Sequence, residues 1–219
     1  ASAYILGVPA NLTGCYDIWT NPHDDPTWTS HGYLYNFVTA LKGNIWAQCH
    51  EVSVMESVQN PFFPFQKLNF LTTTGLQCYN AGKCGASAAH GAVALPETYS
   101  FPSDPIMQFV GPLVGATQNG SEQWYIPNAG GQWNATTKRG VKTANGTSPA
   151  EGVLLAYGPA YGNSNYGTVM YEAGHNLNNS GTAAERVQAQ RAYFNFVLYT
   201  GKQRRLSVSA TVPPTANSL

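Results

Sequence analysis

The sequence predicts an α/β domain of three layers, with a mostly parallel β-sheet between helices. One observation is that short apolar segments alternate with segments of helical periodicity, in the first 60 residues and again after residue 150. Such alternation with short links is typical of a parallel sheet with helices on its faces. A second observation is that residues 60–150 lose this order and are rich in Pro, Gly and aromatics, which predicts a long loop-rich insertion. We expect one α/β domain over 1–205 and a separate arm or linker over 206–219.

The first half of the predicted domain is a strand–helix–strand–helix succession. Thr29 or Ser30 caps the first helix, whose apolar residues recur at i, i+3, i+4 and i+7, and Gly43 follows where a helix can end. The predicted elements are a strand at 16–19, a helix with the stripe Leu34, Phe37, Val38 and Leu41, a strand at 44–47 and a helix at 52–58.

The second half contains the clearest helix of the chain. Thr182 and Glu185 form a capping box, and Gly201 marks the end of the helix. We expect the helix to pack through one stripe, formed by Val187, Arg191, Phe194, Val197 and Leu198. The charged group of Arg191 would extend to solvent at the margin of this stripe. Strands are predicted at 123–126, at 152–158 and at 206–212. A further strand is predicted in the segment that ends at His175.

Composition excludes several classes of function. Charged residues are 10% of the chain, the formal net charge is zero and the pI is near 7.1. A neutral chain lacks the basic surface that nucleic acids or anionic lipids require. No apolar run is long enough to span a membrane.

Polar residues are mostly amides and hydroxyls, a balance typical of secreted and cell-surface proteins. Five Asn-x-Ser/Thr sequons are candidate glycosylation sites: Asn11, Asn119, Asn134, Asn145 and Asn178. Cys78 and Cys84 bracket a short loop and are predicted to form a disulfide, which favours an oxidising compartment. Cys15 and Cys49 stand apart, and Cys49 is a buried residue, a disulfide partner of Cys15 or a nucleophile.

The segment around Cys49 suggests chemistry. An apolar strand runs into Cys49 and then into helix-forming sequence, a position where α/β proteins hold a nucleophile beside helical amides. His175 ends another apolar strand, so the two side chains are candidates for a Cys–His pair. Glu172 is the candidate third group that orients the histidine.

These motifs resemble the class I glutamine-amidotransferase-like superfamily, which includes trehalose-utilisation-like domains and implies a flavodoxin-like sheet. The segments DIWTNPHDDPTW, IWAQCHEVSVMES and VMYEAGHN are also similar to domains of large secreted bacterial surface proteins. The superfamily enzymes carry Gly-x-Cys-x-Gly at the elbow and Glu two residues after the histidine. Here the elbow reads Ala-Gln-Cys-His-Glu, and Leu177 stands at the second position.

Two binding sites are weaker alternatives. His23, His50 and His175 follow predicted strands, so they would meet at one sheet edge, where a divalent metal is the cofactor they could hold. Aromatic residues could line a glycan groove, namely Trp19, Trp28, Trp124, Tyr125 and Trp133.

The leading functional hypothesis is an extracellular surface-protein domain with a structural or interaction role and no cofactor. Its partners would be further copies of itself or other surface-protein domains, in an array or filament to which the arm at 206–219 adds a strand. The alternative is a cysteine-dependent hydrolase or amidase that uses Cys49 and His175.

Overall fold

The computed structural model describes residues 16–21, 32–49, 51–56, 68–78, 97–110, 124–126, 130–143, 152–173 and 182–209. These residues form an α/β fold built on one mixed sheet. The strands are β1 (Ile18–Asn21), β2 (Asn44–Gln48), β3 (Gln77–Cys78), β4 (Glu97–Tyr99), β5 (Trp124–Tyr125), β6 (Lys138–Thr143), β7 (Val153–Pro159) and β8 (Thr168–Glu172). The helices are α2 (Gly32–Thr39), α3 (Glu51–Glu56), the 3-10 turn η2 (Ala160–Gly162) and α5 (Ala183–Ser209).

The sheet changes character across β8. On one side, β1, β2 and β8 are parallel neighbours in that order. On the other side, β8 pairs antiparallel with β7, and the strands beyond it, β6, β5, β4 and β3, also pair antiparallel. The parallel order expected from the sequence is therefore found in the β1–β2–β8 part, and the rest of the sheet differs from that expectation.

The starts of the parallel strands are fixed by one side chain and one pair of glycines. Asn44 donates from Nδ2 to the Asp17 carbonyl over 3.1 Å and accepts the Thr168 N–H over 2.8 Å. A Cβ at Gly167 would overlap the carbonyl oxygen of Gly43. Only glycine therefore allows the chain leading into β8 to approach the chain leading into β2 so closely.

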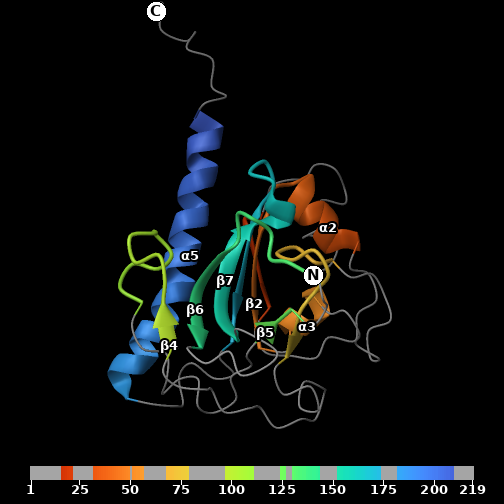
Figure 1. The fold of residues 1–219 in the computed structure, drawn as a ribbon. Helices are drawn as coiled ribbons and strands as arrows, with labels where there is room; N and C mark the ends of the chain where they lie inside the picture. Colours follow the sequence, from red (N-terminus) through yellow and green to blue (C-terminus); the bar gives the residue numbers. More distant parts are fainter. Residues whose placement is uncertain are drawn as a thin grey trace, which may run out of the picture.

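Two apolar cores lie on the two faces of the sheet, which gives three layers (Figure 1). On one face, α2 and α3 bury their apolar residues against β2 and β8, among them Leu34, Phe37 and Val38 as the sequence predicted. On the other face, α5 and the segment 101–110 cover Trp46, Met170 and the middle of β7. Figure 1 shows α5 on the opposite side of the sheet from α2 and α3, with its C-terminal turns extending past the sheet.

Helix α5 differs from its prediction in two ways. It continues through Gly201 to Ser209, so residues 206–209 are helical where the alternating pattern predicted a strand. The helix also packs through Ala192 and Phe196, whereas Phe194 and Leu198 of the predicted packing stripe are exposed. Residues 210–219, the remainder of the predicted arm, lie outside the described residues.

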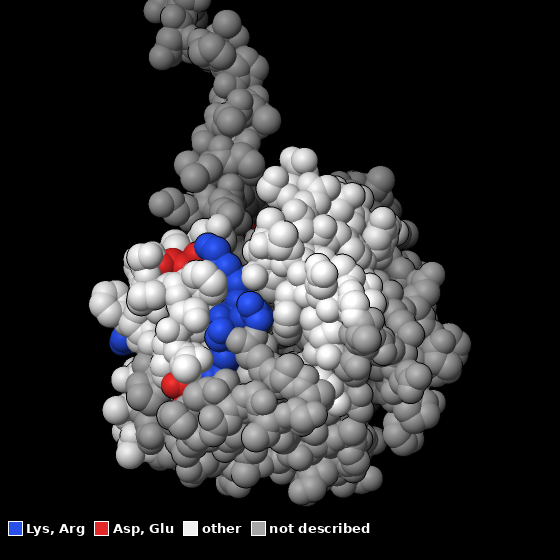
Figure 2. Space-filling model, in the orientation of Figure 1, with Lys and Arg blue, Asp and Glu red and all other residues white. Residues whose placement is uncertain are grey.

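Strand β6 falls within the predicted insertion at 60–150. Val141 is the one apolar side chain of β6 and lies in the core on the α5 face, so the sequence of β6 shows no apolar alternation. Figure 2 shows basic side chains in a column at the position of β6, whose sequence supplies Lys138, Arg139 and Lys142. Much of the other described surface in that view is uncharged, consistent with the low charge of the chain.

Candidate functional site

Cys49 follows β2 at the carboxyl end of a parallel strand, and α3 begins two residues later. Its backbone N–H donates to the Glu172 carbonyl over 3.1 Å, and its own carbonyl accepts the Val52 N–H over 3.1 Å. The first bond ties Cys49 to the end of β8, and the second closes the turn into α3. The side chain of Cys49 is a buried thiol.

The backbone of Cys49 has φ = 55°, in the left-handed region. Side chains with a Cβ rarely occupy this region, and holding one there costs on the order of 1–3 kcal/mol. Five other non-glycine residues among those described share a positive φ: Lys42, Asn69, Phe101, Phe109 and Tyr161. Cys49 differs from them because it follows a parallel strand and stands two residues before a helix, the position that a nucleophile occupies in other α/β proteins.

Glu172 is the last residue of β8 and pairs in register with Gln48, the residue before the elbow. Its side chain is buried, and its Oε2 accepts the indole N–H of Trp46 over 3.0 Å. Its Oε1 has no hydrogen-bond partner among the residues that the structure describes. Burial raises the pKa of Glu172 to about 8, and the Trp46 hydrogen bond opposes that rise. At neutral pH the side chain is therefore largely a neutral carboxylic acid that carries a proton.

Glu172 contacts Cys49 through its backbone carbonyl, and its side chain lies on a face of the sheet. Trp46 belongs to the core on the α5 face, and it donates to Glu172, which places the carboxyl of Glu172 on that face. The contact with Cys49 is made instead by the Glu172 carbonyl. The structure thus brings two of the three predicted catalytic residues to one edge of the sheet.

Glu56 is a buried acidic residue that the sequence analysis missed. It ends α3, and its carboxyl accepts hydrogen bonds from the Leu71 N–H at 2.7 Å, the Thr72 hydroxyl at 2.6 Å and the Tyr171 hydroxyl at 2.6 Å. Burial raises the pKa of Glu56 to about 7, although these hydrogen bonds lower it. The sequence signal for this residue was a Glu beside Met55 in a short apolar helix. A carboxyl buried in such a helix needs hydrogen-bond donors, which predicts polar partners around it.

Glu51 is the first residue of α3 and is also buried. With Glu56 and Glu172, it makes three fully buried carboxyl side chains around β2, α3 and β8. The elbow region is therefore rich in buried acids, a pattern more common at sites of chemistry than in cores that only pack.

Several predicted site residues lie outside the described residues: His23, His50, His175, Cys84, Asn11, Asn119, Asn145 and Asn178. The Cys–His pair, the histidine metal site and four sequons therefore remain predictions. The backbone of Cys78 lies in β3, and its predicted disulfide with Cys84 also remains a prediction.

Asn134, the one sequon within the described residues, uses its side-chain amide for folding. Its Nδ2 donates to the Phe70 carbonyl over 3.0 Å, and its backbone N–H donates to the Leu71 carbonyl over 2.9 Å. A glycan on Nδ2 would take one of its two hydrogens, which leaves one N–H for the bond to the Phe70 carbonyl.

Two features are absent from the described part of the chain. Within it, no three His, Cys, Asp or Glu side chains group as metal ligands would. None of its helices combines the length and the apolar character that crossing a membrane requires.

Comparisons of the chain with family models, with curated proteins and with solved structures return no match. The resemblance to the amidotransferase-like superfamily therefore rests on the sequence motifs, and what the structure adds is an α/β fold with a strained strand-to-helix turn at Cys49.

Proposed function

We propose that this protein is a cysteine-dependent hydrolase or amidase with Cys49 as its nucleophile. The observation that carries this proposal is the φ of 55° at Cys49, between a buried parallel strand and a helix. Strain of this kind persists where the surroundings enforce it, and it is concentrated at functional sites. The bonds from Cys49 to Glu172 and from Val52 to Cys49 are the restraints that enforce it here.

The reaction would follow the course of other cysteine acyl transfers. The thiol proton passes to His175, and the sulfur of Cys49 bonds to the carbonyl carbon of an amide or ester. The C–N or C–O bond then breaks, and the leaving group takes the proton from His175. Water hydrolyses the thioester, which releases the acid and restores the thiol.

Thiol reactivity tests this proposal. The side chain of Cys49 is fully buried, so its reaction with iodoacetamide requires the turn at Cys49 to open. In native protein we expect Cys49 to be alkylated, with a midpoint below about pH 8.5. Peptide mapping would identify the modified cysteine, and an activated ester should leave an acyl group on the same peptide. The Cys49→Ala variant should lose both products, whereas Cys15→Ala should retain them. Modification of Cys49 only after denaturation would contradict the proposal.

The structural role predicted from the sequence is a second candidate. It is supported by exposed apolar side chains on α5, where Phe194 is 56% and Leu198 is 71% exposed. Apolar patches on a soluble protein commonly mark interaction sites. In this proposal the chain is an extracellular surface-protein domain whose α5 contacts another protein molecule.

A photo-crosslinking amino acid at position 198 tests the second candidate. We expect covalent adducts with protein under native conditions, and none when the same group replaces Asn165 on the exposed turn before β8. Absence of adducts at position 198 at all protein concentrations would exclude the interaction role of α5.

A further inference from the structure

Helix α5 is apolar on two opposite sides. Its inner side buries Ala192 and Phe196 in the core of the sheet. Its outer side exposes Val187 (54%), Phe194 (56%) and Leu198 (71%). Since one side already satisfies the need to pack on the sheet, the outer side requires another explanation.

The outer side is a narrow stripe. At 100° per residue, Val187, Arg191, Phe194 and Leu198 fall within about 60° of one another around the helix. Their spacing of four, three and four residues is that of alternating d and a positions in a heptad. We call these four residues the α5 stripe.

Phe109 extends the α5 stripe sideways. Its ring is 77% exposed and lies 5.7 Å from the guanidinium carbon of Arg191. Arg191 also donates from Nη1 to the Phe109 carbonyl over 3.4 Å. The charged group of Arg191 is thus held over one aromatic ring while its side chain is exposed.

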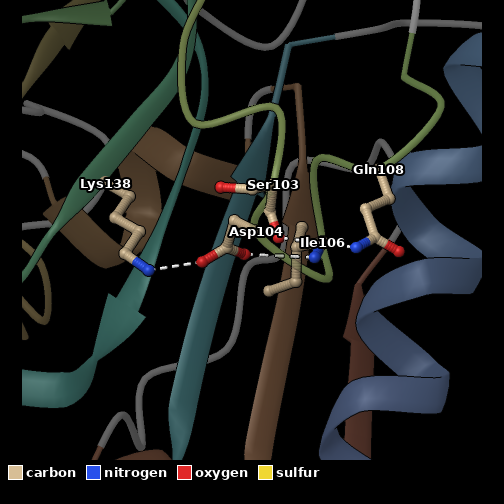
Figure 3. A network of polar contacts seen from close by, with 5 residues as sticks. All are labelled: Ser103, Asp104, Ile106, Gln108 and Lys138. Carbon is tan, nitrogen blue, oxygen red and sulfur yellow. Dashed lines mark hydrogen bonds and ion pairs between the residues drawn. The ribbon is translucent and has the colours of Figure 1, made fainter.

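The segment that carries Phe109 is well anchored (Figure 3). Asp104 forms an ion pair with Lys138 of β6 and accepts the Ile106 N–H over 3.1 Å. Asn195 of α5 donates from Nδ2 to the carbonyls of Ile106 and Gln108, over 3.0 Å and 2.8 Å. Phe109 and the α5 stripe therefore belong to one ordered surface.

We propose that the α5 stripe binds a second copy of this chain, with the two α5 helices antiparallel about a two-fold axis between residues 192 and 193. An antiparallel heptad pair places an a residue opposite a d residue. In this register Val187 faces Leu198 of the second copy, and Arg191 faces Phe194 of the second copy. Both pairs have the same midpoint, so one axis satisfies the whole stripe.

The chemistry of each pair fits this arrangement. Two aliphatic side chains meet at the ends, and a guanidinium meets an aromatic ring near the axis, where cation–π attraction is favourable. Arg191 is held on one side by Phe109, which leaves it positioned for a second ring. The two Arg191 side chains lie on either side of the two-fold axis, and the Phe194 rings between them keep the two positive charges apart.

The exposed area indicates a reversible dimer. Val187, Phe194, Leu198 and Phe109 together expose roughly 450 Å² of apolar side chain per copy. Two copies would bury at most about 900 Å² from these residues, below the 1,200–2,000 Å² of a stable specific interface. We therefore expect self-association that depends on concentration.

This inference rests on the interaction role proposed for α5 and names the partner. Sedimentation velocity of the full chain over a hundredfold concentration range tests it. We expect the mass to rise with concentration from 23.5 kDa toward twice that value. Leu198→Lys should weaken association at least tenfold, whereas Tyr35→Lys, a matched change at an exposed aromatic of α2, should not alter it.

Two substitutions at one position test the register. Phe194→Lys places a cation opposite Arg191 of the second copy and should weaken association at least tenfold. Phe194→Glu places a carboxylate there and should keep association within about threefold of the wild type, with a stronger dependence on salt. Circular dichroism should show the same helix content in both variants.

Three outcomes would overturn the inference. Equal loss of association in the Phe194→Lys and Phe194→Glu variants would exclude this register. A monomer at all concentrations with adducts at position 198 to another protein would keep the interaction role and exclude the second copy. A monomer whose position 198 crosslinks only within its own chain, or to nothing, would exclude both.

Discussion

The two faces of the sheet each bury a glutamate, and the two carboxyls differ in the number of hydrogen bonds that they accept. On the α2/α3 face, Glu56 accepts hydrogen bonds from Leu71, Thr72 and Tyr171. On the α5 face, Glu172 accepts one, from Trp46, and its Oε1 has no partner within the described part of the chain. The pKa of Glu56 is about 7 and that of Glu172 is about 8.

The number of donors distinguishes the two acids. Glu56 connects α3 to the segment at 68–78 and to β8, so its hydrogen bonds hold three parts of the fold together. Among the described residues Glu172 has one donor, and its proton is more tightly held than that of Glu56. Buried groups left short of partners are costly, and they persist most often at functional sites.

The largest expected effect comes from truncating Glu56. Glu56→Ala leaves the Leu71 N–H and the Thr72 and Tyr171 hydroxyls buried without an acceptor. We expect the free energy of unfolding to fall by about 3–5 kcal/mol in urea denaturation. Glu172→Ala, the matched truncation on the other face, should cost less. An equal loss in both variants would remove the distinction between the two acids.

The pH dependence of stability tests both acids together. Each has a folded-state pKa above the ordinary 4.5. Above pH 4.5 the unfolded chain therefore loses these protons first, and the folded chain is destabilised as the pH rises. The free energy of unfolding should fall by about 1.4 kcal/mol per pH unit for each group, until about pH 7 for Glu56 and about pH 8 for Glu172.

Glu172→Gln isolates the second of these groups. We expect this variant to lose the decline between about pH 7 and about pH 8, because Glu172 is the one of the two acids that still carries its proton in the folded protein there. The measurement is urea denaturation at each pH. A wild-type chain whose stability does not fall over the same interval would show that Glu172 is already ionised in the folded protein.

The strain at Cys49 gives a smaller effect. Glycine occupies positive φ without penalty, whereas alanine does not. We expect Cys49→Gly to be about 1 kcal/mol more stable than Cys49→Ala, although both lack the thiol. Thermal unfolding of the two variants measures the difference. An alanine variant as stable as the glycine variant would show that the turn relaxes and that φ is not enforced.

The smallest effect is expected for single donors to the two acids. Tyr171→Phe removes one of the donors to Glu56 and should cost about 1 kcal/mol. Trp46→Phe removes the only donor to Glu172 in the described part of the chain and should raise the pKa of Glu172. Infrared titration of the carboxyl band would measure that rise. A lowered pKa would show that water reaches Glu172 in its place.

Residues that repeat a pattern were predictable from the sequence, and residues whose role depends on distant partners were not. The stripe of α2 and the strand before Cys49 follow from local periodicity, so their burial was anticipated. Strand β6 has no apolar alternation, and it forms through backbone pairing with the edge of β7. The packing side of α5 was mistaken because the helix is apolar on both sides, and only contact with the sheet selects Ala192 and Phe196.

The candidate site divides in the same way. Cys49 was found because a strand-to-helix turn is a local signal, and its positive φ became visible only in the structure. Glu56 was missed because its donors lie in a loop and in β8, far along the chain. Sequence alone does not place such partners beside one another.

The pairing of β2 with β8 has a consequence for the order of folding. Asn44 and Thr168, which begin these neighbouring strands, are 124 residues apart in sequence. Closing so large a loop carries an entropic cost and slows folding, since distant contacts must form before they stabilise anything. During synthesis, β2 must also wait for β8, and its apolar edge is open to other chains until then. A chaperone that binds extended apolar segments would therefore be expected to engage the nascent chain at β2, and release would depend on the arrival of Thr168.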